Sequence, residues 1–280
     1  ANSNFKDFDF EGSNFSVLID TLAYNTYITA FNSNMVVNES FLDSATVREN
    51  VVSLARNIGY VPRSRSASKA NISFTYKTTS TASTATLSAG LVCVGTVENT
   101  NYLFSIPNDV TTTIVNGVAT FDNIDVYQGT FLRKQFVVDG SLDQRFLLDN
   151  SFIDSSTIVV KVKGLSETGL GREYSLASNI LNIDSTSETY LIQEVKDERY
   201  ELLFGDGYFG KKLENGTIIT ATYIITDGKD GNGPSNFAYS GRIVDDLGNA
   251  IVPSSDIDVI TNSSASNGGD IETIDSIKYF

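Results

Sequence analysis

Apolar residues recur at intervals of three and four along the first part of the chain, which is the spacing of a helix. The positions concerned are Phe15, Leu18, Ile19, Leu22, Tyr24, Tyr27, Ile28, Phe31 and Met35. Ser13 precedes them and is a candidate N-cap, because its hydroxyl can accept a hydrogen bond from a free backbone N–H. The pattern therefore predicts a long helix whose apolar side chains lie on connected faces.

A second apolar series, followed by a glycine and a proline, predicts a second helix. Its positions are Val47, Val51, Leu54, Ala55 and Ile58. Asp43 or Ser44 can cap its start, Gly59 can end it, and Pro62 prevents it from resuming. We expect the two helices to form a hairpin, whose wide aromatic stripe needs a third element or another chain to cover it.

From about residue 70 the pattern changes to the two-residue alternation of β-strands. The clearest stretches are residues 72–76, 158–162, 188–195 and 217–226, the last being the strongest β-branched run. No periodic helix separates them, which disfavours a parallel sheet and predicts mainly antiparallel pairing. Residues 78–89, almost entirely Thr, Ser and Ala, are either a polar edge strand or a loop.

Glycine pairs mark the turns of this β-rich region. Asn116-Gly117 separates two short apolar runs and has the sequence that a type I′ hairpin requires. Asp139-Gly140 and Asn215-Gly216 are further turn signals.

Beyond Pro253 the chain becomes rich in Ser, Asp and Asn, and residues 263–269 have the composition of a linker. Asp270 can then cap a short helix carrying Ile271, Ile274 and Ile277. We therefore predict an α+β chain with a helical region at 1–62, a β-rich domain at 63–252, and, at 253–280, a linker and the start of a following, truncated domain. The chain is expected to end at the start of a further helix. Because the chain does not begin with Met, we expect it to be a piece of a longer protein.

The composition excludes most enzyme chemistry. The chain has no His and one Cys, Cys93, so no Ser-His-Asp relay, HExxH zinc site, thiolate metal cage or disulfide can be built from it. We expect no metal and no cofactor, and we expect Cys93 to be a small core residue.

The charge also limits the partners. A net charge of −14 disfavours nucleic acid, whose binding depends on basic groups that neutralise phosphates. No apolar run is long enough to cross a membrane. Residues 48–77 stand apart with six basic groups and one acidic group, a local charge of +5. This stretch is either a docking surface for an acidic partner or second copy, or a solvated helix end and loop.

Three motifs could carry chemistry. Residues 205–210 match GxGxxG, but no helix is predicted to follow, so a turn between strands is the better interpretation than a nucleotide site. Residues 227–233 resemble a calcium loop with the wrong ligand positions. Paired carboxylates remain the one catalytic option, and the candidates are Asp206, Glu214, Asp227 and Asp230.

The same region resembles a known family. Its glycine-rich blocks, together with the segment 268–278, are similar to the signature of the baseplate J-like family of contractile-tailed bacteriophages. The blocks consist of Phe204, Gly205, Asp206, Gly207, Gly210, Gly216, Tyr223, Gly231 and Asn232. Residues 7–13, 22–25, 38–41 and 59–62, together with Ser66 and Ala67, resemble the amino-terminal region of T-even-type baseplate wedge subunits. Residues 80–185 carry no such resemblance.

The resemblance implies a structural protein with no catalytic residue and no cofactor. It implies paired copies in each baseplate wedge, contacts with other wedge subunits through helical bundles, and a ring around the central hub that rearranges when the sheath contracts. The expected location is the tail baseplate of the virion, assembled in the host cytoplasm. The partners expected are a second copy, other wedge subunits and ring neighbours, with no nucleic acid and no membrane. The resemblance also implies a carboxy-terminal region that this chain lacks.

One candidate assembly face follows from the helical pattern. It consists of Phe15, Leu18, Leu22, Tyr24, Tyr27 and Phe31, which either meet other helices or pack on the chain's own β region. The alternative function is a tail adhesin that binds or cleaves carbohydrate through the carboxylates named above.

Overall fold

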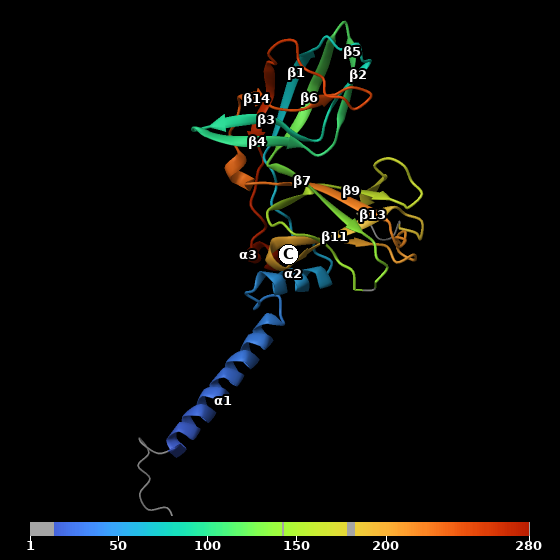
Figure 1. Cartoon of the computed structure of the whole chain (residues 1–280). Coiled ribbons are helices and arrows are strands. Elements are labelled where there is room, and N and C mark those ends of the chain that lie inside the picture. Colours follow the sequence, from blue (N-terminus) through green and yellow to red (C-terminus); the bar gives the residue numbers. More distant parts are fainter. Residues whose placement is uncertain (1–13, 142, 178–182, 280) are drawn as a thin grey trace, which may run out of the picture. The chain divides into compact units, whose positions relative to one another are not determined.

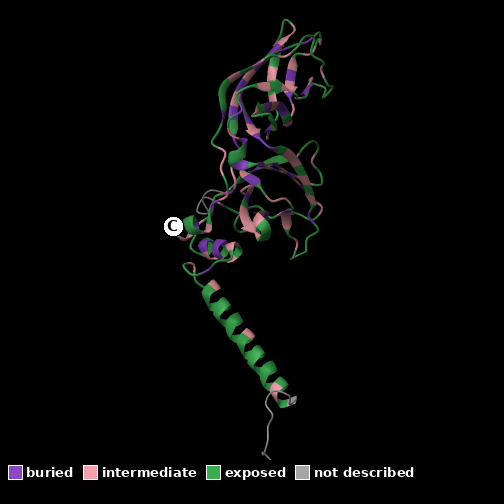
Figure 2. Cartoon of the chain, turned by 90° about the vertical axis from the view of Figure 1, so that its left-hand side faces the viewer, coloured by how far each residue is buried: buried purple, intermediate pink, exposed green. Residues whose placement is uncertain are grey.

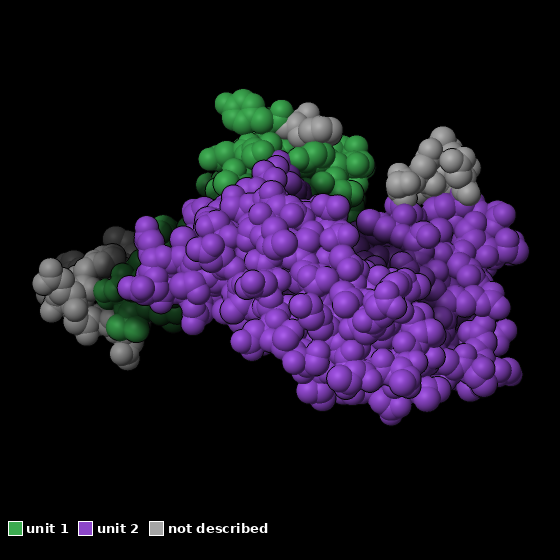
Figure 3. All heavy atoms as spheres, turned by 90° about the horizontal axis from the view of Figure 1, so that it is seen from above, with its two compact units in different colours: residues 1–62, 273–280 green, residues 63–272 purple. Residues whose placement is uncertain are grey.

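The structure is a computed structural model that describes residues 14–141, 143–177 and 183–279. It has two compact units, coloured separately in Figure 3. The helical unit contains residues 1–62 and 273–280, and the β unit contains residues 63–272. A helical start, a mainly antiparallel β region and a short final helix confirm the predicted fold class. The predicted cap Ser13 lies outside the described residues.

Helix α1 (Asn14–Glu39) is long and exposed (Figures 1 and 2). Asp20 and Glu39 are its only charged residues. Three of its threonines, Thr21, Thr26 and Thr29, donate their hydroxyls to the carbonyl oxygens four residues earlier. These hydroxyls are satisfied within the helix, which leaves its outer surface still less polar.

Helix α2 (Arg48–Asn57) begins in a way that the sequence analysis did not foresee. Neither Asp43 nor Ser44 caps it: Val47 is the N-cap residue and no described side chain caps the helix, but Glu39 reaches the segment just before it from the end of α1. The Glu39 carboxylate accepts hydrogen bonds from Thr46 N and Val47 N and from the side chain of Asn50. A carboxylate suits this place, since the start of a helix carries partial positive charge.

The end of α2 agrees with the prediction. Gly59 has a φ of +88°, and its N–H bonds to Arg56 O while Tyr60 N–H bonds to Ala55 O. This pair of bonds satisfies two of the last free carbonyls of the helix, as in a Schellman motif.

Helix α3 (Ile274–Lys278) covers the apolar face of α2. The core of the helical unit consists of Ala45, Val51, Val52, Ala55 and Ile277, with Leu42, Leu54, Tyr60 and Ile274 packed around them. Among the described residues this core includes none from α1, so α1 and α2 do not pack as the expected hairpin. Thr273, and not Asp270, caps α3 by accepting a hydrogen bond from Ser276 N.

The β unit contains a nine-stranded and a seven-stranded sheet (Figure 1). The larger sheet runs in the order β14 (Phe237–Tyr239), β3 (Gly90–Val97), β4 (Thr100–Ile106), β6 (Val118–Gln128), β5 (Val110–Val115), β2 (Thr84–Leu87) and β15 (Ile243–Val244). Strand β1 (Lys69–Lys77) pairs with β6 and with β16 (Val259–Ser266). A buried cluster that includes Phe74, Tyr76, Phe104 and Phe121 forms the core of this sheet.

The seven-stranded sheet is also mostly antiparallel. Its order is β7 (Thr130–Val137), β13 (Ile218–Ile225), β9 (Ile153–Lys163), β10 (Arg172–Leu176), β11 (Thr189–Val195), β12 (Arg199–Phe204) and β8 (Phe146–Leu148). Strands β10 and β11 are parallel. The short 3-10 helix η3 (Lys196–Glu198) connects β11 to β12, and η4 (Gly228–Gly231) lies between β13 and β14 of the larger sheet. Its core is a separate buried cluster around Leu148, Val160, Leu202 and Ile219.

The predicted turns are confirmed. Asn116 and Gly117 have φ values of +53° and +75° between β5 and β6, as a type I′ turn requires. Gly140 and Gly216 also have positive φ. Cys93 is fully buried in the larger sheet, and burial raises the pKa of its thiol to about 12, so it is an unreactive core residue.

Two polar segments contain strands. For the first, residues 78–89, the sequence analysis allowed either a strand or a loop, and for the second, residues 263–269, it predicted a linker. Strand β2 lies within residues 78–89 and is bordered by β5 and β15. Most of the predicted linker 263–269 belongs to β16, which pairs with β1. The linker interpretation was wrong there because pairing with a neighbouring strand satisfies backbone groups whether or not the side chains are apolar.

Candidate assembly surfaces

Helix α1, which is mostly green in Figure 2, carries a long series of exposed large apolar side chains. The six residues predicted as an assembly face are all more than half exposed, from 52% for Phe15 to 66% for Tyr27. Val17, Ile19, Met35, Val36 and Val37 are exposed beside them. A helix with this much uncovered apolar surface needs partners, because soluble proteins rarely leave large contiguous apolar patches in water.

The six predicted residues lie on two sides of α1. Successive residues of a helix are turned by about 100°, at 3.6 residues per turn. Phe15, Leu18 and Leu22 therefore share one side, whereas Tyr24, Tyr27 and Phe31 lie on nearly the opposite side. Polar residues such as Asn25 and Asn32 separate the two sides. The single predicted face is thus two faces, and a neighbour on one side would leave the other uncovered.

The first family block, residues 204–210, forms a tight turn after β12. No helix follows it before β13, which confirms the turn interpretation and removes the geometry of a dinucleotide site. The Asp206 carboxylate accepts hydrogen bonds from Tyr208 N and Phe209 N at 2.8 and 2.9 Å. These backbone N–H groups lower the pKa of Asp206, so the carboxylate is ionised near neutral pH.

Glycine is required at the base of this turn. A Cβ atom added to Gly205 would lie 2.1 Å from the carbonyl carbon of Gly210, which is backbone and cannot move aside. Gly207 N–H bonds to Gly210 O, and Gly210 N–H bonds to Asp184 O in the neighbouring loop. The turn is therefore held in one conformation.

The remaining single residues of the signature have structural contacts. Phe204 packs in the core of the smaller sheet with its ring 5.5 Å from that of Phe146. Gly216 has a φ of +85°, and Tyr223 donates its hydroxyl to Asn150 at 2.6 Å. These residues shape the sheet and its turns.

The last two blocks of the signature meet in space. Asn232 donates a hydrogen bond to Gly268 O and accepts one from Gly268 N, at 3.0 and 2.8 Å. A Cβ atom added to Gly268 would lie 2.3 Å from Gly228 O, so the two backbones are in contact. Lys229 pairs with Asp270 at 2.8 Å and lowers the pKa of that carboxyl. The sequence analysis recognised both blocks but not that they pair.

This junction includes residues that the sequence analysis missed. Gln128, at the end of β6, accepts hydrogen bonds from Thr226 Oγ1 and Asp227 N and donates one to the Asp227 carboxylate. A Cβ atom on Gly231 would lie 2.7 Å from Gln128 Cγ. Gln128 thus ties the larger sheet to the turn after β13, and no local pattern marks it in the sequence.

The basic stretch 48–77 is divided between the two units. Arg48 and Arg56 belong to α2, whereas Arg65 and Lys69 belong to the β unit. Lys69 pairs with Asp125 at 2.8 Å, and Arg65 lies 3.6 Å from Asp270. Two of the six basic side chains of this stretch therefore pair with acidic groups of the same chain. That the stretch docks an acidic partner stays a prediction.

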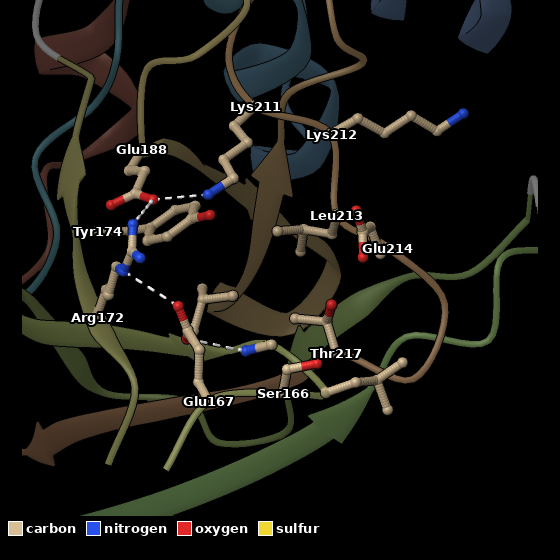
Figure 4. Close-up of a pocket in the computed structure, with 13 residues that line it drawn as sticks. Ser166, Glu167, Arg172, Tyr174, Glu188, Lys211, Lys212, Leu213, Glu214 and Thr217 are labelled. Atoms are coloured by element: carbon tan, nitrogen blue, oxygen red, sulfur yellow. Dashed lines mark hydrogen bonds and ion pairs between the residues drawn. The ribbon is translucent and has the colours of Figure 1, made fainter. Parts of the chain in front are cut away.

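The four candidate carboxylates do not form one site. Glu214 lines a pocket of about 310 Å³ in the smaller sheet (Figure 4), but Asp206, Asp227 and Asp230 are not among its lining residues. The acids that line this pocket with Glu214 are Glu167 and Glu188. Arg172 pairs with both at 3.1 Å, and Lys211 pairs with Glu188 at 2.7 Å.

The electrostatics of this pocket do not suit glycoside hydrolysis. That reaction needs one carboxyl group whose pKa is raised so that it can donate a proton. The hydrogen bond from Lys211 instead lowers the pKa of Glu188. Of the four candidate carboxylates, Asp206 has a lowered pKa, because it accepts hydrogen bonds from the backbone of Phe209 and Tyr208. The adhesin alternative gains no support from this geometry.

Within the described ranges, no helix combines the length and apolar character needed to span a bilayer. Those ranges also contain no group of three or more acidic, Cys or His side chains that could hold a metal ion.

Comparison with known proteins agrees with the resemblance seen in the sequence. Residues 1–60 match the family described as the helical domain of gp6-like baseplate wedge proteins. The chain is 31% identical over 302 aligned positions to the baseplate wedge protein gp6 of Enterobacteria phage T4. The alignment covers 99% of this chain and 43% of that relative, so the chain spans less than half of the relative's length. The family resemblance is thereby confirmed: along nearly its whole length this chain is similar to a phage baseplate wedge protein, and its first sixty residues match the family's helical domain.

Proposed function

We propose that this chain is part of a structural subunit of a phage tail baseplate wedge. It acts by binding other subunits and catalyses no reaction. The proposal includes the partners expected from the sequence: a second copy, other wedge subunits and ring neighbours, with neither nucleic acid nor a membrane among them. It also includes a place in the ring around the central hub, rearrangement during sheath contraction, and assembly in the host cytoplasm.

The observation that carries the proposal is the apolar surface of α1. This helix lies within the segment that matches the gp6-like helical domain, and apolar side chains cover two opposite sides of it. An apolar face of a helix is normally packed against another element, and α1 has two such faces. We infer that α1 packs between at least two neighbouring helices in the assembled wedge, which would cover both sides at once.

The test is to place one charge on each side of α1 in turn. Tyr27→Asp and Phe15→Asp should each prevent association with co-expressed wedge subunits, because a carboxylate buried in an apolar helix bundle lacks a compensating partner. The β unit should stay folded, since its cores contain no residue of α1. Co-purification measures the association, and circular dichroism measures the fold.

Asn25→Asp is the matched control, because it adds the same charge to the polar strip between the two apolar sides. It should leave association intact. If both apolar-side variants bind wedge subunits as well as the unchanged chain does, the proposed role of α1 is wrong. If only one variant binds, α1 meets its partners on one side alone.

A further inference from the structure

The chain contains four Asn-Gly pairs, a dipeptide that is prone to spontaneous deamidation. They are Asn116-Gly117, Asn215-Gly216, Asn232-Gly233 and Asn267-Gly268. The backbone nitrogen of the glycine can attack the side-chain amide of the asparagine, because glycine has no Cβ atom to hinder the approach. The four pairs are equivalent in the sequence, but the fold treats their glycine nitrogens differently.

Three of the four glycine nitrogens are held in hydrogen bonds. The bonds run from Gly216 N to Val138 O, from Gly233 N to Ala265 O and from Gly268 N to Asn232 Oδ1, at 2.7, 2.9 and 2.8 Å. Each bond must break before the nitrogen can turn towards the preceding side chain, and such a break requires local opening of the fold. These three pairs are therefore protected.

The pair Asn116-Gly117 is different. It forms the turn between β5 and β6 (Figure 1), where Val115 pairs with Val118 and the Asn116 side chain is exposed. A two-residue turn is closed by hydrogen bonding between the residues that flank it, which leaves the nitrogen of its second residue without a partner. Accordingly, within the described residues no hydrogen bond engages Gly117 N or the Asn116 side chain. A free nitrogen and a free side-chain amide are thus adjacent at the surface.

We propose that Asn116 is the site at which the folded chain deamidates first. Gly117 N loses its proton to the solvent and forms a bond to Asn116 Cγ, the bond from Cγ to the side-chain nitrogen breaks, and ammonia leaves. Water then opens the resulting cyclic imide at either of its two carbonyl carbons and returns a proton to the nitrogen. The products are aspartate and isoaspartate, and no oxidation or reduction takes place.

Both products change the tip of this hairpin. Each adds a negative charge, and isoaspartate also lengthens the main chain by one carbon atom, which a type I′ turn between β5 and β6 does not accommodate. Gly117 O accepts a hydrogen bond from Thr78 N at 2.8 Å, and isoaspartate should disturb that bond as well. The site lies outside α1, so this inference does not depend on the proposed role in the baseplate.

The test is to store the folded full chain and the same chain unfolded in urea side by side in warm, mildly alkaline buffer. Peptide mapping by mass spectrometry measures how much of each asparagine has become aspartate or isoaspartate. Asn215 is the matched control within the chain, because it is also exposed but its glycine nitrogen is bonded. In the folded chain Asn116 should convert roughly tenfold faster than Asn215, since a bonded nitrogen reacts only in the opened fraction of molecules. In the unfolded chain the two rates should be similar.

Asn116→Gln should remove most of the isoaspartate that the folded chain forms, because the longer side chain closes a ring with the next nitrogen much more slowly. Conversion of Asn215, Asn232 or Asn267 in the folded chain as fast as that of Asn116 would overturn the proposal. Equal protection of all four pairs by folding would overturn it too, since the free nitrogen of Gly117 would then make no difference.

Discussion

At the scale of single residues, close contacts explain some of the glycines in the segments that resemble the family. Gly205 and Gly268 each lie where a Cβ atom would meet backbone within 2.3 Å. Gly231 is equally crowded, but by a side chain: an added Cβ atom would lie 2.7 Å from Gln128 Cγ. These three positions allow no side chain in the present backbone arrangement, whereas Gly207, Gly210 and Gly216 have the positive φ that favours glycine.

Gly205→Ala should lower the free energy of unfolding of the β unit by about 1–3 kcal/mol, because the added methyl group forces the turn backbone apart. Urea denaturation followed by tyrosine fluorescence measures the change. Gly164→Ala is the control, since a Cβ atom there would make only ordinary contacts, 3.7 Å from Glu167. Equal stabilities for the two variants would contradict the proposed crowding at Gly205.

At the scale of elements, the corner between α1 and α2 depends on one carboxylate. Glu39 ends α1 and accepts hydrogen bonds from the loop and the first turn of α2. The bond from Asn50 and those from Thr46 lower its pKa from 4.5 to about 2. A group whose pKa is lower in the folded state stabilises the fold above its unfolded pKa and loses that effect as the pH falls through its folded pKa.

The start of α2 should therefore loosen as the pH falls from about 4.5 towards 2, when Glu39 becomes protonated. NMR of the Thr46 and Val47 amides should show their hydrogen bonds weakening in that interval. Glu39→Gln should weaken the hydrogen bonds of the Thr46 and Val47 amides at neutral pH. It should also remove the change in their NMR signals between pH 4.5 and 2. Glu49→Gln, in the first turn of α2, should leave the transition in place. A pH response that survives Glu39→Gln would assign it to another group.

At the scale of the whole molecule, the chain has two units with separate cores. The core of the helical unit joins α2 to α3, elements that lie more than 200 residues apart in the sequence. The β unit has two buried clusters of its own. Because no residue is shared between these cores, we expect the two units to respond separately to core substitutions.

Ile277→Ala should destabilise the helical unit without weakening the β unit. Ile277 is fully buried against α2, and removing such a side chain costs about 2–5 kcal/mol in larger cores. Hydrogen exchange should become faster in α2 and α3 and stay unchanged in β9 and β13. Tyr279→Ala, at a residue that is 93% exposed in the same helical unit, should change neither region. Faster exchange throughout the β unit would show that the two units unfold together.

The sequence predicted most elements because their signals are local. Gly59 ends α2, Asn116-Gly117 forms the type I′ turn, and the β-branched run at 217–226 contains β13. The caps of α2 and α3 were assigned wrongly, because the polar group nearest in sequence does not always reach the free amides. Strand β16 was missed for a related reason: its pairing partner β1 lies far away in the sequence.

The sequence alone determined the fold class, the exclusion of histidine and disulfide chemistry, and the resemblance to baseplate wedge proteins. These follow from residue types, their periodicity and their local spacing. Only the tertiary structure decided that the glycine blocks meet at Gly268, that the apolar residues of α1 remain uncovered, and that Gln128 ties the larger sheet to the turn after β13. Such facts depend on contacts between distant segments, and a periodic pattern carries no information about which distant segments come together.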